Sequence, residues 1–127
     1  MGKWRDGKAV LTIPGRDEPV ELRVAASYRA RTRGLLGRDG VDGAIMLTPC
    51  GSVHTFRMRF TIDVAYLDKE LRVIAVTTMK PGRLGAPRLR SRHVLESEAG
   101  AMERWGVRPG VRLAIRTAED LQDDQGL

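Results

Sequence analysis

The segment from Cys50 to Asp68 constrains the fold of this chain more than any other stretch, because its residues alternate in character over the longest run in the sequence. One side of an extended chain would carry Phe56, Met58, Phe60, Ile62, Val64 and Tyr66, and the other Arg57, Arg59, Thr61 and Asp63. Such a strand needs a sheet on which to pack. Because residues 55–67 are long for one strand, we expect a kink or bulge near Phe60 and Thr61.

The flanking segments supply the rest of a sheet and two short helices. A turn at Pro14-Gly15-Arg16-Asp17 predicts a first hairpin. Further strands are expected at 9–13, 20–24, 44–48, 71–78, 93–95 and 111–115, with 71–78 apolar on both faces like a central strand. One helix should run from a Ser27 cap to Gly37, and another from about Ser97 to Gly106.

Strands and helices do not alternate along the chain, which predicts an α+β domain. We expect a strongly curled, mostly antiparallel sheet or small barrel with two short helices. The 127 residues fit one domain, with its core at about 9–116 and an acidic tail, 117–127, that should fray.

Composition narrows the class of protein further. A single cysteine cannot form an internal disulfide, and no apolar run is long enough to span a membrane or to form a secretory signal. We therefore expect a cytoplasmic protein, although a chain trimmed of a signal would look the same. The net charge of +6 favours attraction to anions, and arginines gather at 29–38 and 83–92. Such clusters are more often solvated surface than anion sites.

Four blocks of sequence resemble the bacterial and archaeal domain of unknown function 192 family. They are Arg31-x-x-Gly34-Leu35-Leu36-Gly37-Arg38, the Cys50 to Asp68 run with its His54-Thr55-Phe56-x-Met58-Arg59-Phe60-x-Ile62-Asp63 core, Val94-Leu95-Glu96-x-x-Ala99-Gly100, and Gly106 to Val111. Ala30 stands where the family often has an acidic residue, Arg57 where glycine is usual and Thr61 where proline is usual. The resemblance implies a compact, barrel-like α+β domain and implies no activity.

One enzyme hypothesis and one metal hypothesis start from Cys50. A cysteine nucleophile would use Cys50 with His54 as base and Asp63 or Glu96 as orienting group. A zinc site would need Cys50, His54, His93 and Asp63 to converge, and C-x3-H alone is common by chance. We expect no metal and no cofactor, and we regard buried packing as the commoner role for such a cysteine. His93 and Glu96 could act as acid and base, but odd spacing on a strand sends them to opposite faces.

The hypothesis we favour is a binding module for a small anionic ligand or an acidic protein segment. Its pocket would lie near residues 54–63, under the basic loop 80–92. The expected ligand-binding residues are His54, Phe56, Met58, Arg59, Asp63, Arg88, Arg90 and Glu96. A nucleic-acid partner is the third hypothesis, and the lack of aromatic residues in the basic loop argues against it. The sequence sets no oligomeric state.

Overall fold

The computed structural model describes residues 4–120, without the side chains of Tyr28 and Thr32, and most of the predicted acidic tail lies outside this range. Its strands are β1 (Gly7–Thr12), β2 (Val20–Ala25), β3 (Ala44–Leu47), β4 (Ile62–Leu67), β5 (Val73–Met79), β6 (His93–Glu98) and β7 (Ala114–Thr117). The helices are α1 (Tyr28–Arg33), α2 (Ala101–Trp105) and a third short helical segment at 118–120, which the sequence did not predict. Within the described range, no helix has the length and apolar character that crossing a membrane requires.

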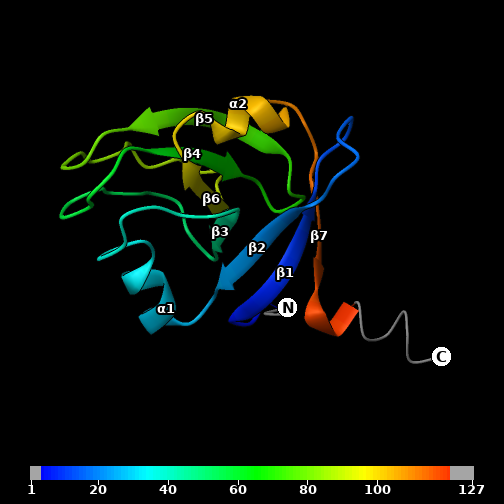
Figure 1. Cartoon of the computed structure of the whole chain (residues 1–127), viewed down its shortest axis with the longest axis horizontal. Coiled ribbons are helices and arrows are strands. Elements are labelled where there is room, and N and C mark those ends of the chain that lie inside the picture. Colours follow the sequence, from blue (N-terminus) through cyan, green and yellow to red (C-terminus); the bar gives the residue numbers. More distant parts are fainter. Residues whose placement is uncertain (1–3, 121–127) are drawn as a thin grey trace.

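All seven strands belong to one sheet in the order β5-β4-β6-β3-β2-β1-β7. The neighbours β2 and β3 run parallel, and the other neighbouring strands are antiparallel. Figure 1 shows β4 and β5 running across the molecule while β1 and β2 run steeply beside them, so the sheet is strongly twisted. This confirms the predicted mostly antiparallel α+β domain.

The sheet is open, and the structure does not confirm the predicted barrel. β5 and β7 are its two edges. The segments that precede these strands meet at one corner, where Arg72 and Arg112 form an isolated bridge. There the Val73 N–H donates to the carbonyl oxygen of Val111 over 2.8 Å, which holds the curled edges together without closing the sheet.

Only the second part of the long alternating segment 55–67 forms a strand. β4 begins at Ile62, and before it the Met58 N–H donates to the Thr55 carbonyl in a turn. Arg57 adopts a left-handed backbone with φ 66°, at the position where the resembled family usually has glycine. Phe56, predicted to face the core, is 46% exposed.

The roles of the two central hairpin strands are exchanged relative to the prediction. β4, expected to be half-buried, lies between β5 and β6, and every residue in it is buried. The segment 71–78, expected to be central, forms the edge strand β5. The alternation in β4 therefore separates two cores rather than core from solvent: Ile62 and Tyr66 join one, and Ala65 and Leu67 the other.

Both helix predictions are confirmed in part. The Ser27 hydroxyl accepts a hydrogen bond from the Ala30 N–H over 3.1 Å and caps α1 as expected. The helix ends earlier than predicted, at Gly34, whose φ of 45° and ψ of −122° suit a residue without a side chain. α2 ends at Gly106 as predicted but begins at Ala101, because Ser97 still belongs to β6.

Asp63 joins three elements in the middle of the structure. Its carboxylate is 4% exposed, and one oxygen accepts from the Thr78 hydroxyl of β5 over 2.7 Å. The other oxygen accepts from the N–H groups of Gly100 and Met102 at the start of α2. Asp63 therefore caps the start of α2 from a strand of the sheet. Arg59 pairs with Asp39 at the surface.

We expect Asp63→Ala to lower the free energy of unfolding by about 2–4 kcal/mol, because it leaves buried N–H groups without an acceptor. Urea denaturation followed by circular dichroism measures this change. Asp39→Ala is the matched control and should have little effect, since it breaks an exposed ion pair. Equal losses in the two variants would contradict the role assigned to Asp63.

Candidate functional site

A pocket of about 250 Å³ opens between α1 and the loop that follows β3. Three sequence blocks that lie far apart in the chain meet there: the end of α1 with the residues after it, the segment 50–58, and β6. The pocket is lined by Arg31, Arg33, Gly34, Leu35, Leu36, Leu47, Pro49, Cys50, Ser52, Val53, His54, Met58 and Glu96. Its walls are thus largely apolar, with a few polar groups among them.

Arg31 comes from the last turn of α1 and is anchored at one end. Its Nη1 donates to the Pro49 carbonyl oxygen over 3.1 Å. Its Nε is buried, and no described residue accepts a hydrogen bond from it. In a guanidinium group, Nε–H and the adjacent Nη2–H form the edge that binds a carboxylate through two parallel hydrogen bonds. Arg31 was not among the predicted site residues, although it stands first in the Arg31-x-x-Gly34 block.

Glu96 faces the same pocket from the middle of the sheet. It lies on β6 between Ile45 of β3 and Val64 of β4, and it is 6% exposed. Gly34 leaves room beside the carboxyl group: a Cβ at that position would lie 4.0 Å from Glu96 Oε1. Among the described residues, no group donates a hydrogen bond to this carboxyl group or forms an ion pair with it. Burial raises its pKa to about 7.

Cys50 and His54, the hypothetical nucleophile and base, both line the pocket, and the contacts described for each side chain are with other residues. The Cys50 thiol donates to the Ser52 carbonyl oxygen over 3.1 Å. Burial raises the pKa of this thiol, Glu96 adds to the rise, and Arg31 opposes it. The His54 ring stacks on the ring of Phe56 with centroids 5.0 Å apart. The contacts of Cys50 favour a neutral thiol rather than a reactive thiolate.

The structure divides the other predicted site residues among several places. Met58 lines the pocket beside Cys50, whereas Phe56 and Arg59 are exposed. Asp63 belongs to the α2 cap. The guanidinium of Arg88 lies 4.9 Å from the centre of the Tyr66 ring, where both residues line a separate hollow. Arg90 is exposed in the loop.

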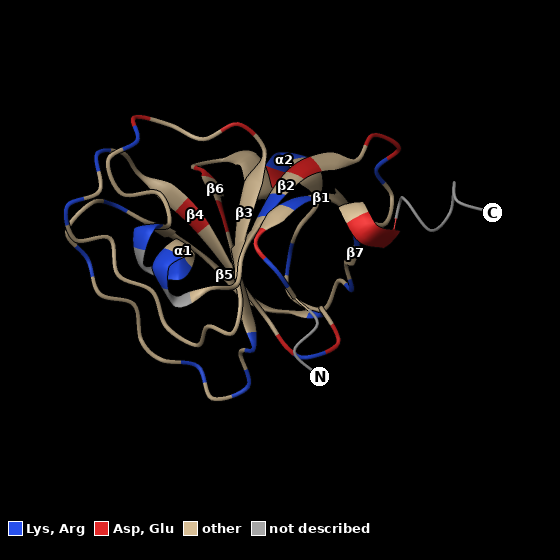
Figure 2. Cartoon of the chain, turned by 90° about the horizontal axis from the view of Figure 1, so that it is seen from below, with Lys and Arg blue, Asp and Glu red and all other residues tan. Residues whose placement is uncertain are grey.

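The basic loop 80–92 lies beside the pocket rather than over it. It runs along the segment 50–55 through hydrogen bonds such as Thr55 N–H to Arg83 O and Arg88 N–H to Gly51 O. None of its residues lines the pocket of Arg31 and Glu96; several of them line the separate hollow beside Tyr66 instead. Figure 2 shows many of the Lys and Arg positions of the domain on its outer loops.

His93 is buried on the other side of β6 from Glu96, as the odd spacing predicted. Its Nδ1 lies 2.7 Å from the Thr48 hydroxyl, and its ring contacts the edge of Trp4. Burial, with a contribution from Arg92, lowers the pKa of His93 to about 4. Residues 4–120 contain no group of three histidine, cysteine, aspartate or glutamate residues that could hold a metal ion.

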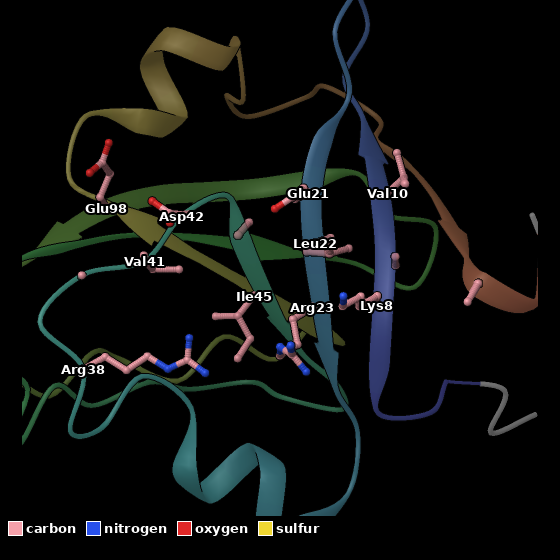
Figure 3. A pocket seen from close by; sticks show the side chains of 14 residues that line it. Lys8, Val10, Glu21, Leu22, Arg23, Arg38, Val41, Asp42, Ile45 and Glu98 are labelled. Atoms are coloured by element: carbon pink, nitrogen blue, oxygen red, sulfur yellow. The ribbon is translucent and has the colours of Figure 1, made fainter.

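A larger groove of about 740 Å³ lies on the face of β1 and β2. Figure 3 shows its cations and its carboxylates on opposite sides of Ile45. The cations are Lys8, Arg23 and Arg38, and the carboxylates are Glu21, Asp42 and Glu98. All six charged residues are exposed, and Glu98 pairs with Arg104. Water can satisfy these groups, whereas it has little access to Glu96.

The burial of Glu96 predicts a specific pH dependence of stability. The folded protein keeps the carboxyl group neutral to about pH 7, whereas the unfolded chain ionises it near pH 4.5. The stability that Glu96 contributes is therefore fully present below pH 4.5. The free energy of unfolding then falls by about 3 kcal/mol as the pH rises to 7. His93 acts in the opposite direction, since its lowered pKa removes stability as the pH falls from 6.5 to about 4.

Glu96→Gln separates the pH dependence of stability that comes from Glu96 from the pH dependence that comes from His93. The free energy of unfolding of the variant minus that of the parent should rise by about 3 kcal/mol between pH 4 and pH 8. Urea denaturation across this range measures the difference. A difference that stays constant with pH would show that Glu96 is ionised in the folded protein.

Cys50 should behave as an unactivated thiol. We expect its alkylation by iodoacetamide to be slow at pH 7 and to accelerate only above the ordinary pKa range of cysteine, because burial disfavours the thiolate. His54→Ala should leave this profile unchanged. Fast alkylation below pH 7 that requires His54 would favour the cysteine enzyme instead.

Comparisons with known proteins agree with the sequence blocks described above. The model of a family described as "Uncharacterized ACR", domain of unknown function 192, matches residues 9–115. The chain is 35% identical to UPF0127 protein PH1112 of Pyrococcus horikoshii over 65% of this chain and 76% of that protein. It is 31% identical to UPF0127 protein PF1050 of Pyrococcus furiosus over 78% of this chain and 90% of that protein.

A solved structure shares the fold. It is a protein of unknown function from Novosphingobium aromaticivorans, with a TM-score of 0.71 and 16% identity over 84% of this chain and 83% of that one. At this identity the likeness concerns the fold alone. The match of the family model over residues 9–115 shows that this chain belongs to the domain of unknown function 192 family, in which its archaeal relatives carry the name UPF0127.

Proposed function

We propose that this protein is a binding module that takes a small anionic ligand into the pocket between α1 and the segment 50–58. One observation carries the proposal: Arg31, whose buried Nε has no described hydrogen-bond acceptor, lines the same pocket as the buried residue Glu96. A buried polar group without a hydrogen bond costs about 1–3 kcal/mol. A ligand that accepts from Arg31 and contacts Glu96 would remove that cost.

The shape and the walls of the pocket favour a compact ligand with an apolar part. A volume of about 250 Å³ lies below the roughly 300–1,000 Å³ that is usual for drug-sized ligands. Leu35, Leu47 and Val53 offer an apolar surface next to the charged edge of Arg31. These dimensions favour a small molecule over an acidic protein segment.

The anchoring of Arg31 supports its role as the anion-binding group. The hydrogen bond from Nη1 to Pro49 fixes the guanidinium plane before any ligand arrives, so little side-chain entropy is lost on binding. Arg88 and Arg90, the arginines first expected to bind the ligand, are exposed and lie outside this pocket. We therefore assign anion binding to Arg31.

The cysteine enzyme is less well supported than the binding module. A nucleophile needs a thiolate, and both the burial of Cys50 and the nearby Glu96 disfavour one. The cytoplasmic location remains a prediction from the sequence.

Titrations with acetate, butyrate, benzoate and inorganic phosphate at pH 6 test the proposal. Two-dimensional NMR of the folded protein should show saturable shifts at the pocket, with the apolar bodies of butyrate and benzoate binding more tightly than acetate. Arg31→Met should weaken binding by roughly tenfold to a hundredfold, because it removes a charged hydrogen bond. Arg29→Met removes the same charge from an exposed position on α1 and should bind like the parent.

Two outcomes would contradict the proposal. Equal losses in the Arg31 and Arg29 variants would mean that net charge, rather than the pocket, attracts the anion. Binding of an acetylated tri-glutamate peptide, with no binding of any of the four small anions, would transfer the function to recognition of an acidic protein segment.

A further inference from the structure

We propose, resting on the function proposed above, that the ligand is a small monocarboxylic acid that binds together with one proton, shared between its carboxylate and Glu96. Arg31 holds the same carboxylate through its free edge. The pocket therefore selects for a ligand that carries one carboxylate on a short apolar body.

The hydrogen-bonding groups of the pocket match a carboxylate. Nη1 of Arg31 is already occupied by Pro49, so the buried Nε–H lies on the edge that remains for a ligand. A protonated Glu96 supplies one further donor. A carboxylate has two acceptor oxygens, and these two sources of donors can satisfy both of them.

Arg31 and Glu96 do not neutralise each other. They line one pocket and both act electrostatically on Cys50, but the distance between their charged atoms exceeds that of an ion pair. A ligand that contacts both would bridge this gap. A direct ion pair would instead have left no donor for an anion.

The surroundings of Glu96 determine where its proton lies. The titratable and charged groups near it are Arg31 and Arg33 from α1, Cys50 and His54 from the segment 50–58, and Tyr66 from β4. Burial already raises the pKa of Glu96 to about 7, and a second carboxylate beside it would raise that pKa further. Two carboxylates in contact cannot both stay ionised, so the complex retains one proton.

The proton balance of binding follows directly. Well below pH 7, Glu96 already carries the proton, and a ligand anion binds without taking one up. Above pH 7, Glu96 is ionised, and the complex takes one proton from solvent for each ligand bound. Affinity should then fall about tenfold for each pH unit, because one proton enters the binding equilibrium.

Isothermal titration calorimetry with butyrate tests this account in the full chain at pH 6 and pH 8, using two buffers with different heats of ionisation. We expect close to one proton to be taken up per butyrate at pH 8, and only a small fraction of a proton at pH 6. The dissociation constant should be about tenfold weaker at pH 8. Butyramide, a neutral analogue of the same shape, should show no such pH dependence.

Glu96→Gln removes the titratable proton of this side chain and keeps the size of the side chain. Its amide donates a hydrogen bond at every pH, so butyrate should bind to the variant without proton uptake and with the same affinity at pH 6 and pH 8. At pH 8 the variant should bind more tightly than the parent, a gain that a merely structural role would not produce. The free energy of unfolding of the variant at both pH values verifies that it is folded.

The results distinguish this inference from the function on which it rests. Butyrate binding that depends on Arg31 but takes up no proton at pH 8 would overturn the inference and leave the proposed function standing. Phosphate binding through Arg31, with no carboxylate binding, would do the same. No binding of any small anion would overturn both.

Discussion

β4 and β6 are buried on both faces, and most of the other features of this domain depend on that constraint. A strand that is buried on both faces leaves little solvent for a polar side chain, yet each of these strands carries a buried carboxyl group. Asp63 of β4 and Glu96 of β6 are 4% and 6% exposed, respectively. Both carboxyl groups are largely removed from water, but the hydrogen-bond donors around them differ.

Asp63 receives three donors and becomes a structural group. The Thr78 hydroxyl and two N–H groups at the start of α2 surround it, so its charge holds an edge strand and a helix against the centre of the sheet. Glu96 receives no donor from the described residues and is instead left beside a pocket. A satisfied buried carboxylate is explained by the fold. A carboxyl group that receives no protein donor and borders a cavity is instead a candidate for ligand binding.

The pocket also explains why distant sequence blocks belong together. Gly34 ends α1 and leaves space beside Glu96, and the two residues that follow it, Leu35 and Leu36, lie in the pocket wall. The segment 50–58 supplies the opposite wall, and Pro49, just before it, supplies the acceptor that fixes Arg31. The glycine thus has a local role in the backbone and a second role in the shape of the site.

Much of the fold could be predicted from the sequence because its signals are local. The Pro14-Gly15 turn, the Ser27 cap and the Gly106 stop act within a few residues of the chain. The alternation in β4 correctly grouped Ile62 with Tyr66, but could not reveal that the second face is buried too. The turn at 55–58 depends on Thr55, whose hydroxyl donates to the Lys80 carbonyl in a distant loop. Arg31 was missed for the same reason, since its partners lie across the fold.

The most direct test of the central claim is the NMR signal of the Arg31 Nε–H group while butyrate is added to the protein at pH 6. The Nε–H signal that is missing from the spectrum of Arg31→Lys is the signal of Arg31. The account predicts that this signal shifts and saturates with the butyrate concentration, while the Nε–H signals of Arg88 and Arg90 stay in place. A shift of Arg88 or Arg90 with an unchanged Arg31 would contradict it, and would place anion binding on the outer loop.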